Sequence, residues 1–193
     1  MKRMMCVTAA LAASLTLAAC AGDRSPRADD TMPGTVGTSG SMNADREFVE
    51  EQLAMSTVEV ELGRLAQERG THADVKEFGA MLARDHQMAA DSLRPIAARV
   101  NTGAETAGRP VDHDKHREAI DELSELSGRD FDRKFIEEMI DEHEGDIREL
   151  ERKAENAVDP DLKAWATQTL PKMREHLERA KSIKETLDRA GHY

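Results

Sequence analysis

The feature that most constrains this chain is a run of apolar residues at three- and four-residue steps between positions 131 and 157. This spacing predicts an amphipathic helix that buries one face. His143, preceded by Glu142, falls in the middle of that face, and a buried imidazole needs a polar partner. The sequence therefore predicts a helical core that holds a polar group, whose partner is a carboxylate, a water molecule or a metal ion. The apolar face consists of Phe131, Phe135, Met139, Ile140, Ile147 and Leu150.

The composition agrees with packed helices. Aromatic residues make up 3% of the chain and charged residues 34%, so the core must be built mainly from aliphatic side chains, whereas a sheet calls for more β-branched and aromatic residues. The formal net charge of −11 argues against nucleic acid as a partner and against electrostatic docking on an anionic membrane. Both cysteines, Cys6 and Cys20, lie near the start of the chain, which excludes a disulfide framework and thiolate chemistry in the folded part.

The first twenty residues predict export and a lipid anchor. A basic start precedes an apolar run at 6–19, which is shorter than the roughly 20 residues that a membrane-spanning helix needs and is typical of a secretory signal. The run ends in Leu17-Ala18-Ala19-Cys20, which resembles a bacterial lipobox. Residues 1–19 are therefore expected to be a lipoprotein signal peptide, and Cys20 the lipidated residue that anchors the protein to a membrane. The alternative is an ordinary cleaved signal with a chance cysteine.

The residue after the cysteine bears on location. Ala21 stands where an Asp would retain a lipoprotein in the inner membrane, and this favours the periplasmic face of the outer membrane. Residues 20–43 contain mostly Gly, Ser, Thr, Pro and Asp with no apolar period, so they are expected to form a flexible tether behind the lipidated cysteine. Residues 44–193 are then the predicted bundle domain.

Helical periodicity divides that domain into four long segments and one short one. Long helices are expected at about 44–68, 72–100, 131–157 and 159–188, and a short helix within 111–127. The expected N-caps are Asn43 or Asp45 for the first helix, Thr71 for the second and Asp159 for the last. Long helices joined by short turns predict an all-α, antiparallel four-helix bundle with an extra short helix in the central connection.

Several segments together are similar to the bacterial domain-of-unknown-function family 4142. The resemblance implies a ferritin-like four-helix fold in an exported or outer-membrane protein, and it brings no activity with it. One position departs from the family's pattern, because Glu142 stands where an Asp is more usual. The segments are Glu61-Leu62-Gly63-Arg64-Leu65-Ala66, Phe78 with Asp85-His86, Ser127-Gly128 with Phe131-Asp132, Met139 with His143, and Leu170-Pro171 with His176-Leu177.

Four polar residues are expected to meet inside the bundle. Glu59, His86, His143 and His176 each fall on the apolar face near the middle of a long helix, and the middles of antiparallel helices lie at one level. Three imidazoles with a carboxylate suit Fe, Mn, Zn, Cu or Ni. The other interpretation is a network of hydrogen bonds among these groups and buried water, which would fix the register of the helices.

Acidic residues next to the histidines in the sequence would accept hydrogen bonds from the metal-binding rings and so orient them. These second-layer candidates are Asp85, Glu142 and Glu175, each directly before a core histidine. A ferritin-type di-iron centre needs Glu-x-x-His on two helices, and none of the three core histidines has a Glu three residues before it. The leading functional prediction is a non-enzymatic, lipid-anchored periplasmic bundle with an envelope or stress-related binding role. The alternative is a transition-metal-binding or redox protein.

Overall fold

The computed structural model describes residues 35–100 and 113–190, with side chains described for 40–100 and 117–189. These residues form helices alone, as predicted, and none of these helices is long and apolar enough to cross a membrane. The helices are α1 (Thr35–Arg69), α2 (Ala73–Val100), α3 (His113–Glu125), α4 (Gly128–Asn156) and α5 (Pro160–Ala190).

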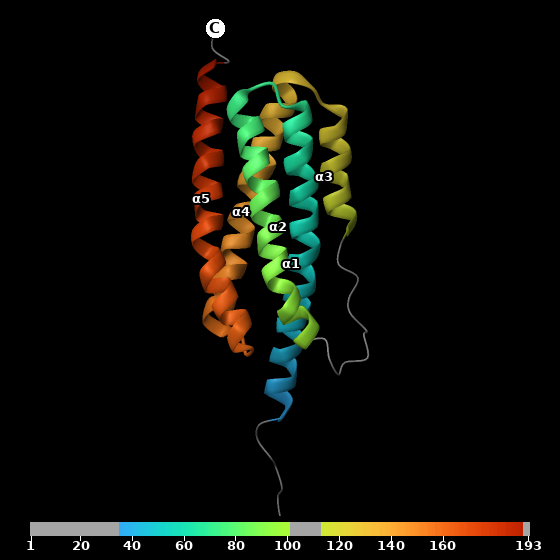
Figure 1. Cartoon of the computed structure of the whole chain (residues 1–193), viewed down its shortest axis with the longest axis vertical. Helices are drawn as coiled ribbons and strands as arrows, with labels where there is room; N and C mark the ends of the chain where they lie inside the picture. The colour runs from blue at the N-terminus through green and yellow to red at the C-terminus, as the bar shows by residue number, and fades with distance from the viewer. Residues whose placement is uncertain (1–34, 101–112, 191–193) are drawn as a thin grey trace, which may run out of the picture. The chain divides into compact units, whose positions relative to one another are not determined.

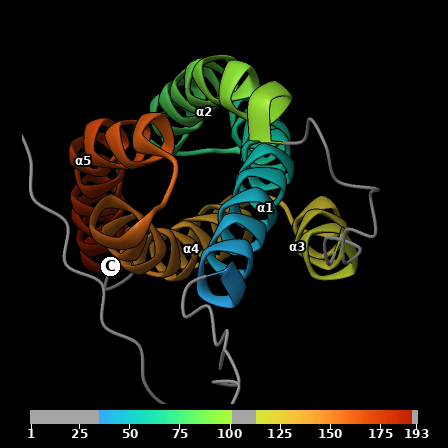
Figure 2. The same cartoon turned by 90° about the horizontal axis from the view of Figure 1, so that it is seen from below.

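The helices pack as two hairpins. α1 packs most extensively on α2, and α4 on α5, while α3 lies outside against α1 and α4 (Figure 1). Seen from the end, the four long helices follow one another in the order α1, α2, α5, α4 around a common interior (Figure 2). Any group at the centre of that interior is therefore reached from both hairpins.

The start of α1 differs from the expected position, and the start of α5 agrees with it. α1 begins at Thr35, nine residues before the expected start at 44, so the last part of the predicted tether is helical. Residues 40–44 are exposed, so no buried face marks this part of the helix, and no proline after Pro33 stops it. The signal peptide, Cys20 and residues 20–34 lie outside the described residues. The start of α5 is as expected, since Asp159 Oδ1 accepts hydrogen bonds from the backbone N–H groups of Asp161 and Leu162 at 2.9 Å each.

A neighbouring helix caps α2. The expected cap Thr71 donates its backbone N–H to Asp132 Oδ1 of α4 at 2.9 Å, and His72 N–H donates to Asp132 Oδ2 at 2.9 Å. Asp132 is buried, so this carboxylate ties the turn of the first hairpin to the second hairpin.

The two helices of the first hairpin approach closely at two glycines. A Cβ atom on Gly63 would lie 2.5 Å from the carbonyl oxygen of Gly79, and a Cβ on Gly79 would lie 2.6 Å from that of Gly63. Only residues without a side chain fit this contact. This contact lies one helical turn from Glu59 and brings α1 close enough to α2 for the Glu59 carboxylate to reach the ring of His86.

A polar layer divides the hydrophobic core into two clusters. On α2, for example, Leu82 belongs to the first cluster and Leu93 to the second, and His86 lies between them. The same order is found on α4, where His143 separates Met139 from Leu150. The layer interrupts apolar packing across the bundle, so its polar atoms must find partners within it. The first cluster contains Phe78, Phe131, Phe135, Ile136 and Ile183 among others, and the second Phe48, Leu162, Trp165, Leu170 and Met173.

Candidate metal centre

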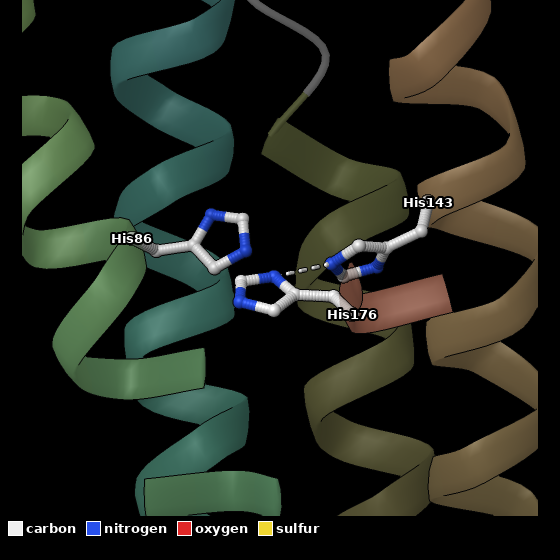
Figure 3. A group of neighbouring side chains, drawn as sticks. All are labelled: His86, His143 and His176. Atoms are coloured by element: carbon white, nitrogen blue, oxygen red, sulfur yellow. Dashed lines mark hydrogen bonds between the residues drawn. The ribbon is translucent and has the colours of Figure 1, made fainter. Parts of the chain in front are cut away.

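Each of the four long helices contributes one side chain to the polar layer. Glu59 comes from α1, His86 from α2, His143 from α4 and His176 from α5, and all four are at most 3% exposed. The three rings point toward one another from three helices, with ring centroids 5.3 to 5.5 Å apart (Figure 3). The structure thus brings together the four residues that the sequence singled out.

The partners of His143 and His176 fix where their ring protons lie. His143 Nδ1 is 2.9 Å from the backbone carbonyl oxygen of Met139, and a carbonyl only accepts, so Nδ1 carries the proton and Nε2 is bare. His176 Nε2 is 3.0 Å from Asp85 Oδ2, so in a neutral ring Nε2 carries the proton and Nδ1 is bare. The two bare nitrogens face each other at 3.2 Å. Without a cation between them, two lone pairs are in contact.

His86 presents a third nitrogen. Its Nδ1 lies 2.5 Å from Glu59 Oε2, and one proton lies between these two atoms. The other nitrogen, Nε2, is buried and has no hydrogen-bond partner, and Figure 3 shows one ring nitrogen of His86 turned toward the other two rings. Glu59 Oε1 is likewise buried without a hydrogen-bond partner, and it lies 3.8 Å from His143 Nδ1.

The spacing of the imidazole nitrogens is that of a ligand set. One ring nitrogen from each histidine lies within 4.8 Å of the others. Two nitrogens bound to one tetrahedral ion at about 2.0–2.1 Å would be about 3.3 Å apart, close to the separation of His143 Nε2 and His176 Nδ1 given above. An ion would have to draw the nitrogen of His86 closer to that pair, from a separation of at most 4.8 Å.

Burial sets the protonation of the layer. It lowers the pKa of His86 and of His176 to about 4, and it lowers that of His143 well below the usual value. It raises the pKa of Glu59 to about 8. At neutral pH the three rings are therefore neutral. Glu59 keeps a proton that it shares with His86 Nδ1, and release of that proton leaves Glu59 as the acceptor for His86 Nδ1–H and makes the Nε2 lone pair available for a metal.

Of the predicted second-layer residues, Asp85 contacts a ring directly. Burial pushes its pKa up, but hydrogen bonds from His176 and Arg84 outweigh burial and the pKa is lowered, so Asp85 is ionised and holds the His176 proton on Nε2. Asp85 also lines an open groove of about 470 Å³ between α2 and α5, together with Lys172. This contact links the buried layer to the surface.

The other two predicted second-layer residues lie elsewhere. Glu175 is exposed on α5 and binds Lys172 Nζ at 2.7 Å, so it does not support a ring. Glu142 lies partly buried on α4 and its Oε2 atom has no hydrogen-bond partner. Burial, Glu59 and Asp146 raise the pKa of Glu142 to about 8.

Sequence reasoning missed Asp146. This residue is buried on α4, and burial together with the nearby Glu59 raises its pKa to about 7. Its position three residues after His143 places it on the same helical face, and that spacing was the available signal.

Comparisons with known proteins agree with the helical fold. A family model described as "Domain of unknown function (DUF4142)" matches residues 31–183. A crystal structure of a DUF305 fragment from Deinococcus radiodurans is similar with a TM-score of 0.60 and 16% sequence identity, over 73% of this chain and 96% of that one. At that identity the likeness concerns the fold alone. No curated protein matches the chain.

Proposed function

The chain belongs to the DUF4142 family of domains of unknown function, and from the geometry of its core we propose that it binds one transition metal ion through His86, His143 and His176. The observation that carries this proposal is the pair of bare imidazole nitrogens facing each other at 3.2 Å. A metal ion placed among three such nitrogens turns a repulsive contact into two bonds.

A hydrogen-bonded network without metal fits these contacts less well. To join His143 to His176 by a hydrogen bond, one of the facing nitrogens must gain a proton, which makes that ring an imidazolium. Burial lowers the pKa of both rings, so at neutral pH this extra proton is unfavourable. The network would also leave His86 Nε2 without a partner, and an unpaired buried polar atom costs about 1–3 kcal/mol.

Each imidazole has its own supporting acceptor. The Asp85 carboxylate accepts from His176 Nε2–H, and the Met139 carbonyl accepts from His143 Nδ1–H. The Glu59 carboxylate pairs with His86 Nδ1. Acceptors of this kind fix the tautomer and raise the basicity of a metal-binding ring. In this arrangement Glu59 supports the ligand His86, whereas the sequence predicted that Glu59 would bind the metal directly. Ionised Glu59 and Asp85 also balance the charge of a divalent ion.

Neutral imidazole suits Zn, Cu, Fe or Ni, and Mn is a further candidate because carboxylates surround the layer. Three protein nitrogens leave a coordination position for water or a small ligand in a tetrahedral site.

The proposal also includes the ferritin-like four-helix arrangement and the periplasmic location at the outer membrane. Cys20 and the preceding signal pattern support that location, and a bound ion would give the anchored bundle its non-enzymatic binding role in the envelope.

Metal analysis of the purified chain tests the proposal. The wild-type protein should bind one equivalent of Zn²⁺ or Co²⁺, and the double variant His86→Ala, His143→Ala should bind none. His72→Ala is the matched control, because His72 lies at the start of α2 with its Nδ1 accepting from Asp74 N–H, and it should keep the full equivalent. A wild-type protein that takes up none of Fe, Mn, Zn, Cu or Ni in stoichiometric amount would refute the proposal.

Membrane fractionation tests the anchor separately. Cys20→Ser should release the protein from membranes, since the lipid would have no attachment point. Unchanged membrane retention of that variant would count against lipidation and leave the metal site untouched.

A further inference from the structure

An ion that binds among the three imidazoles must first pass through the wall of the bundle, because the three histidines are at most 3% exposed. Along the bundle axis a buried apolar cluster lies on each side of the polar layer. To cross such a cluster the ion would have to leave its water without gaining polar partners, which is strongly unfavourable. The route must therefore lead sideways, between two neighbouring helices.

The groove between α2 and α5 reaches the polar layer. Its volume is about 470 Å³, and the buried Asp85 forms part of its lining. Asp85 Oδ2 lies 3.0 Å from His176 Nε2, and the same ring turns its other nitrogen, Nδ1, toward His143 (Figure 3). The Asp85 carboxylate and the His176 ring therefore lie between the groove and the nitrogens that face the centre.

Two other interfaces between helices give poorer access. A cavity of about 170 Å³ between α1 and α2 is lined by residues such as Gln87 and Ala90, and none of the four residues of the layer belongs to its lining. Between α4 and α5 an ion pair closes the surface, since Lys181 Nζ lies 2.9 Å from Oε1 of Glu144, the residue after His143. The groove between α2 and α5 is the more direct path.

Lys172 lies where this path begins. Its Nζ is 3.7 Å from Asp85 Oδ2, the oxygen that also accepts from His176, and 2.7 Å from Glu175 Oε2. Lys172 and His176 belong to α5 and Asp85 to α2, so this one carboxylate joins the two hairpins at the layer. An incoming cation must compete with the Lys172 ammonium for Asp85, and the two positive charges repel each other.

We propose that the metal ion enters and leaves the imidazole site through the groove between α2 and α5, and that Lys172 limits the rate of its passage. The ion displaces Lys172 from Asp85, the hydrogen bond between Asp85 and His176 opens, and the His176 ring rotates to admit the ion. The hydrogen bond then forms again behind the bound ion. This inference rests on the proposed function, to which it adds the path of the ion and the residue that controls its rate.

Stopped-flow absorption of Co²⁺ binding to the full chain tests the proposal. Lys172→Gln removes the charge that competes for Asp85, so association should become about tenfold faster. The matched control is Lys181→Gln, because the exposed fractions of the two lysine side chains are 43% and 44% and Lys181 pairs with Glu144 away from the groove. The control should keep the wild-type rate. Equal acceleration in both variants would show that overall charge sets the rate and would overturn the proposal.

Filling the groove should have the opposite effect. Ala89 lines the groove one helical turn from Asp85, so the indole in Ala89→Trp should cover that carboxylate. Association and release should slow by the same factor and leave the dissociation constant unchanged, because a blocked path raises the barrier in both directions. Gln87→Trp is the control, since it adds the same ring to α2 beside the smaller cavity, and it should leave both rates unaltered.

Cobalt binding at equilibrium separates failure of the route from failure of the site. A wild-type protein that binds no cobalt would refute the imidazole site and the route with it. One equivalent of cobalt bound at rates that neither Lys172→Gln nor Ala89→Trp changes would overturn the route alone. A full equivalent in each variant shows that the variant is folded. If Ala89→Trp binds less, Lys172→Gln and its control decide the question.

Discussion

The Nε2 atom of His143 lies 3.2 Å from the Nδ1 atom of His176, and neither nitrogen carries a proton when both rings are neutral. The Met139 carbonyl and the Asp85 carboxylate impose this arrangement from outside the pair. Because each ring is fixed by a separate acceptor, neither can relieve the contact by exchanging tautomers without leaving that acceptor unsatisfied. The pair therefore selects for a cation between the two rings.

Removing the acceptor behind His176 should weaken metal binding. In Asp85→Asn a neutral amide replaces the charged carboxylate that accepts the hydrogen bond from His176 Nε2–H, so metal affinity should fall roughly 10- to 100-fold. Glu175→Gln is the control, because Glu175 is also acidic and adjacent to His176 but is exposed. Competition titration with a chromophoric chelator measures both affinities. Equal losses in the two variants would show that general negative charge is responsible.

The affinity for metal should depend on pH through Glu59. Its pKa is raised to about 8 by burial, so below pH 8 the Glu59–His86 pair holds two protons, one on Glu59 and one on the neutral ring. The metal-bound state needs the pair to lose one of them, which leaves ionised Glu59 accepting from His86 Nδ1–H and His86 Nε2 bare. Affinity should therefore increase about tenfold per pH unit up to pH 8 and level off above it, with one proton released per ion. Calorimetry in buffers of different ionisation enthalpy counts that proton. Glu59→Gln should abolish this dependence of metal affinity on pH. A dependence that persists unchanged would assign the released proton to another group.

The metal-free protein should lose stability as pH rises from about 6.5 to about 8. The pKa values of Glu59 and Glu142 are raised to about 8 and that of Asp146 to about 7, so in this range the folded state holds protons that the unfolded state has lost. Each such proton contributes a decrease of about 1.4 kcal/mol per pH unit in the free energy of unfolding. The low pKa values of the histidines act in the opposite direction, but only below about 6.5.

Urea unfolding at several pH values measures this slope. The double variant Glu142→Gln, Asp146→Asn should flatten it, because the neutral amides hold no titrating proton. Stability that rises between pH 6.5 and 8 in the metal-free protein would contradict the burial of these carboxyls.

A methyl group at the contact between the first two helices should disturb the site. In Gly63→Ala the new Cβ would lie 2.5 Å from the Gly79 carbonyl oxygen, so α1 and α2 must separate. Overpacking of this kind costs about 1–3 kcal/mol, and the shift should also lengthen the contact between Glu59 and His86. Gly145→Ala is the control: its nearest neighbour is 3.9 Å away, and the change should stabilise α4 by about 0.5–1 kcal/mol. Thermal unfolding should show a lower melting temperature for Gly63→Ala and a higher one for Gly145→Ala.

The sequence predicted the helices and the histidine cluster because both follow from local periodicity. His86, His143 and His176 fall on apolar faces at similar distances from the turns, which is enough to bring them to one level. The expected identity of the family is confirmed by the match over residues 31–183. The non-enzymatic envelope role and the lipid anchor stay predictions.

What the sequence did not predict depends on contacts between distant segments. Asp146 was missed because an acidic residue is normally exposed even where its spacing places it on the face of His143, and its burial depends on polar side chains of α1 such as Gln52. Glu175 was placed behind a histidine by adjacency alone, although neighbours in a helix point about 100° apart. Whether Glu59 binds a metal or supports His86 depends on side-chain geometry that spacing does not determine.

X-ray absorption spectroscopy of the protein loaded with one equivalent of Zn²⁺ shows directly whether three imidazoles bind the ion. The spectrum should contain a nitrogen-dominated coordination shell at about 2.0–2.1 Å, with the outer-shell scattering of three imidazole rings that is lost in the double variant His86→Ala, His143→Ala. A shell made mainly of oxygen, with fewer than two imidazoles, would contradict it.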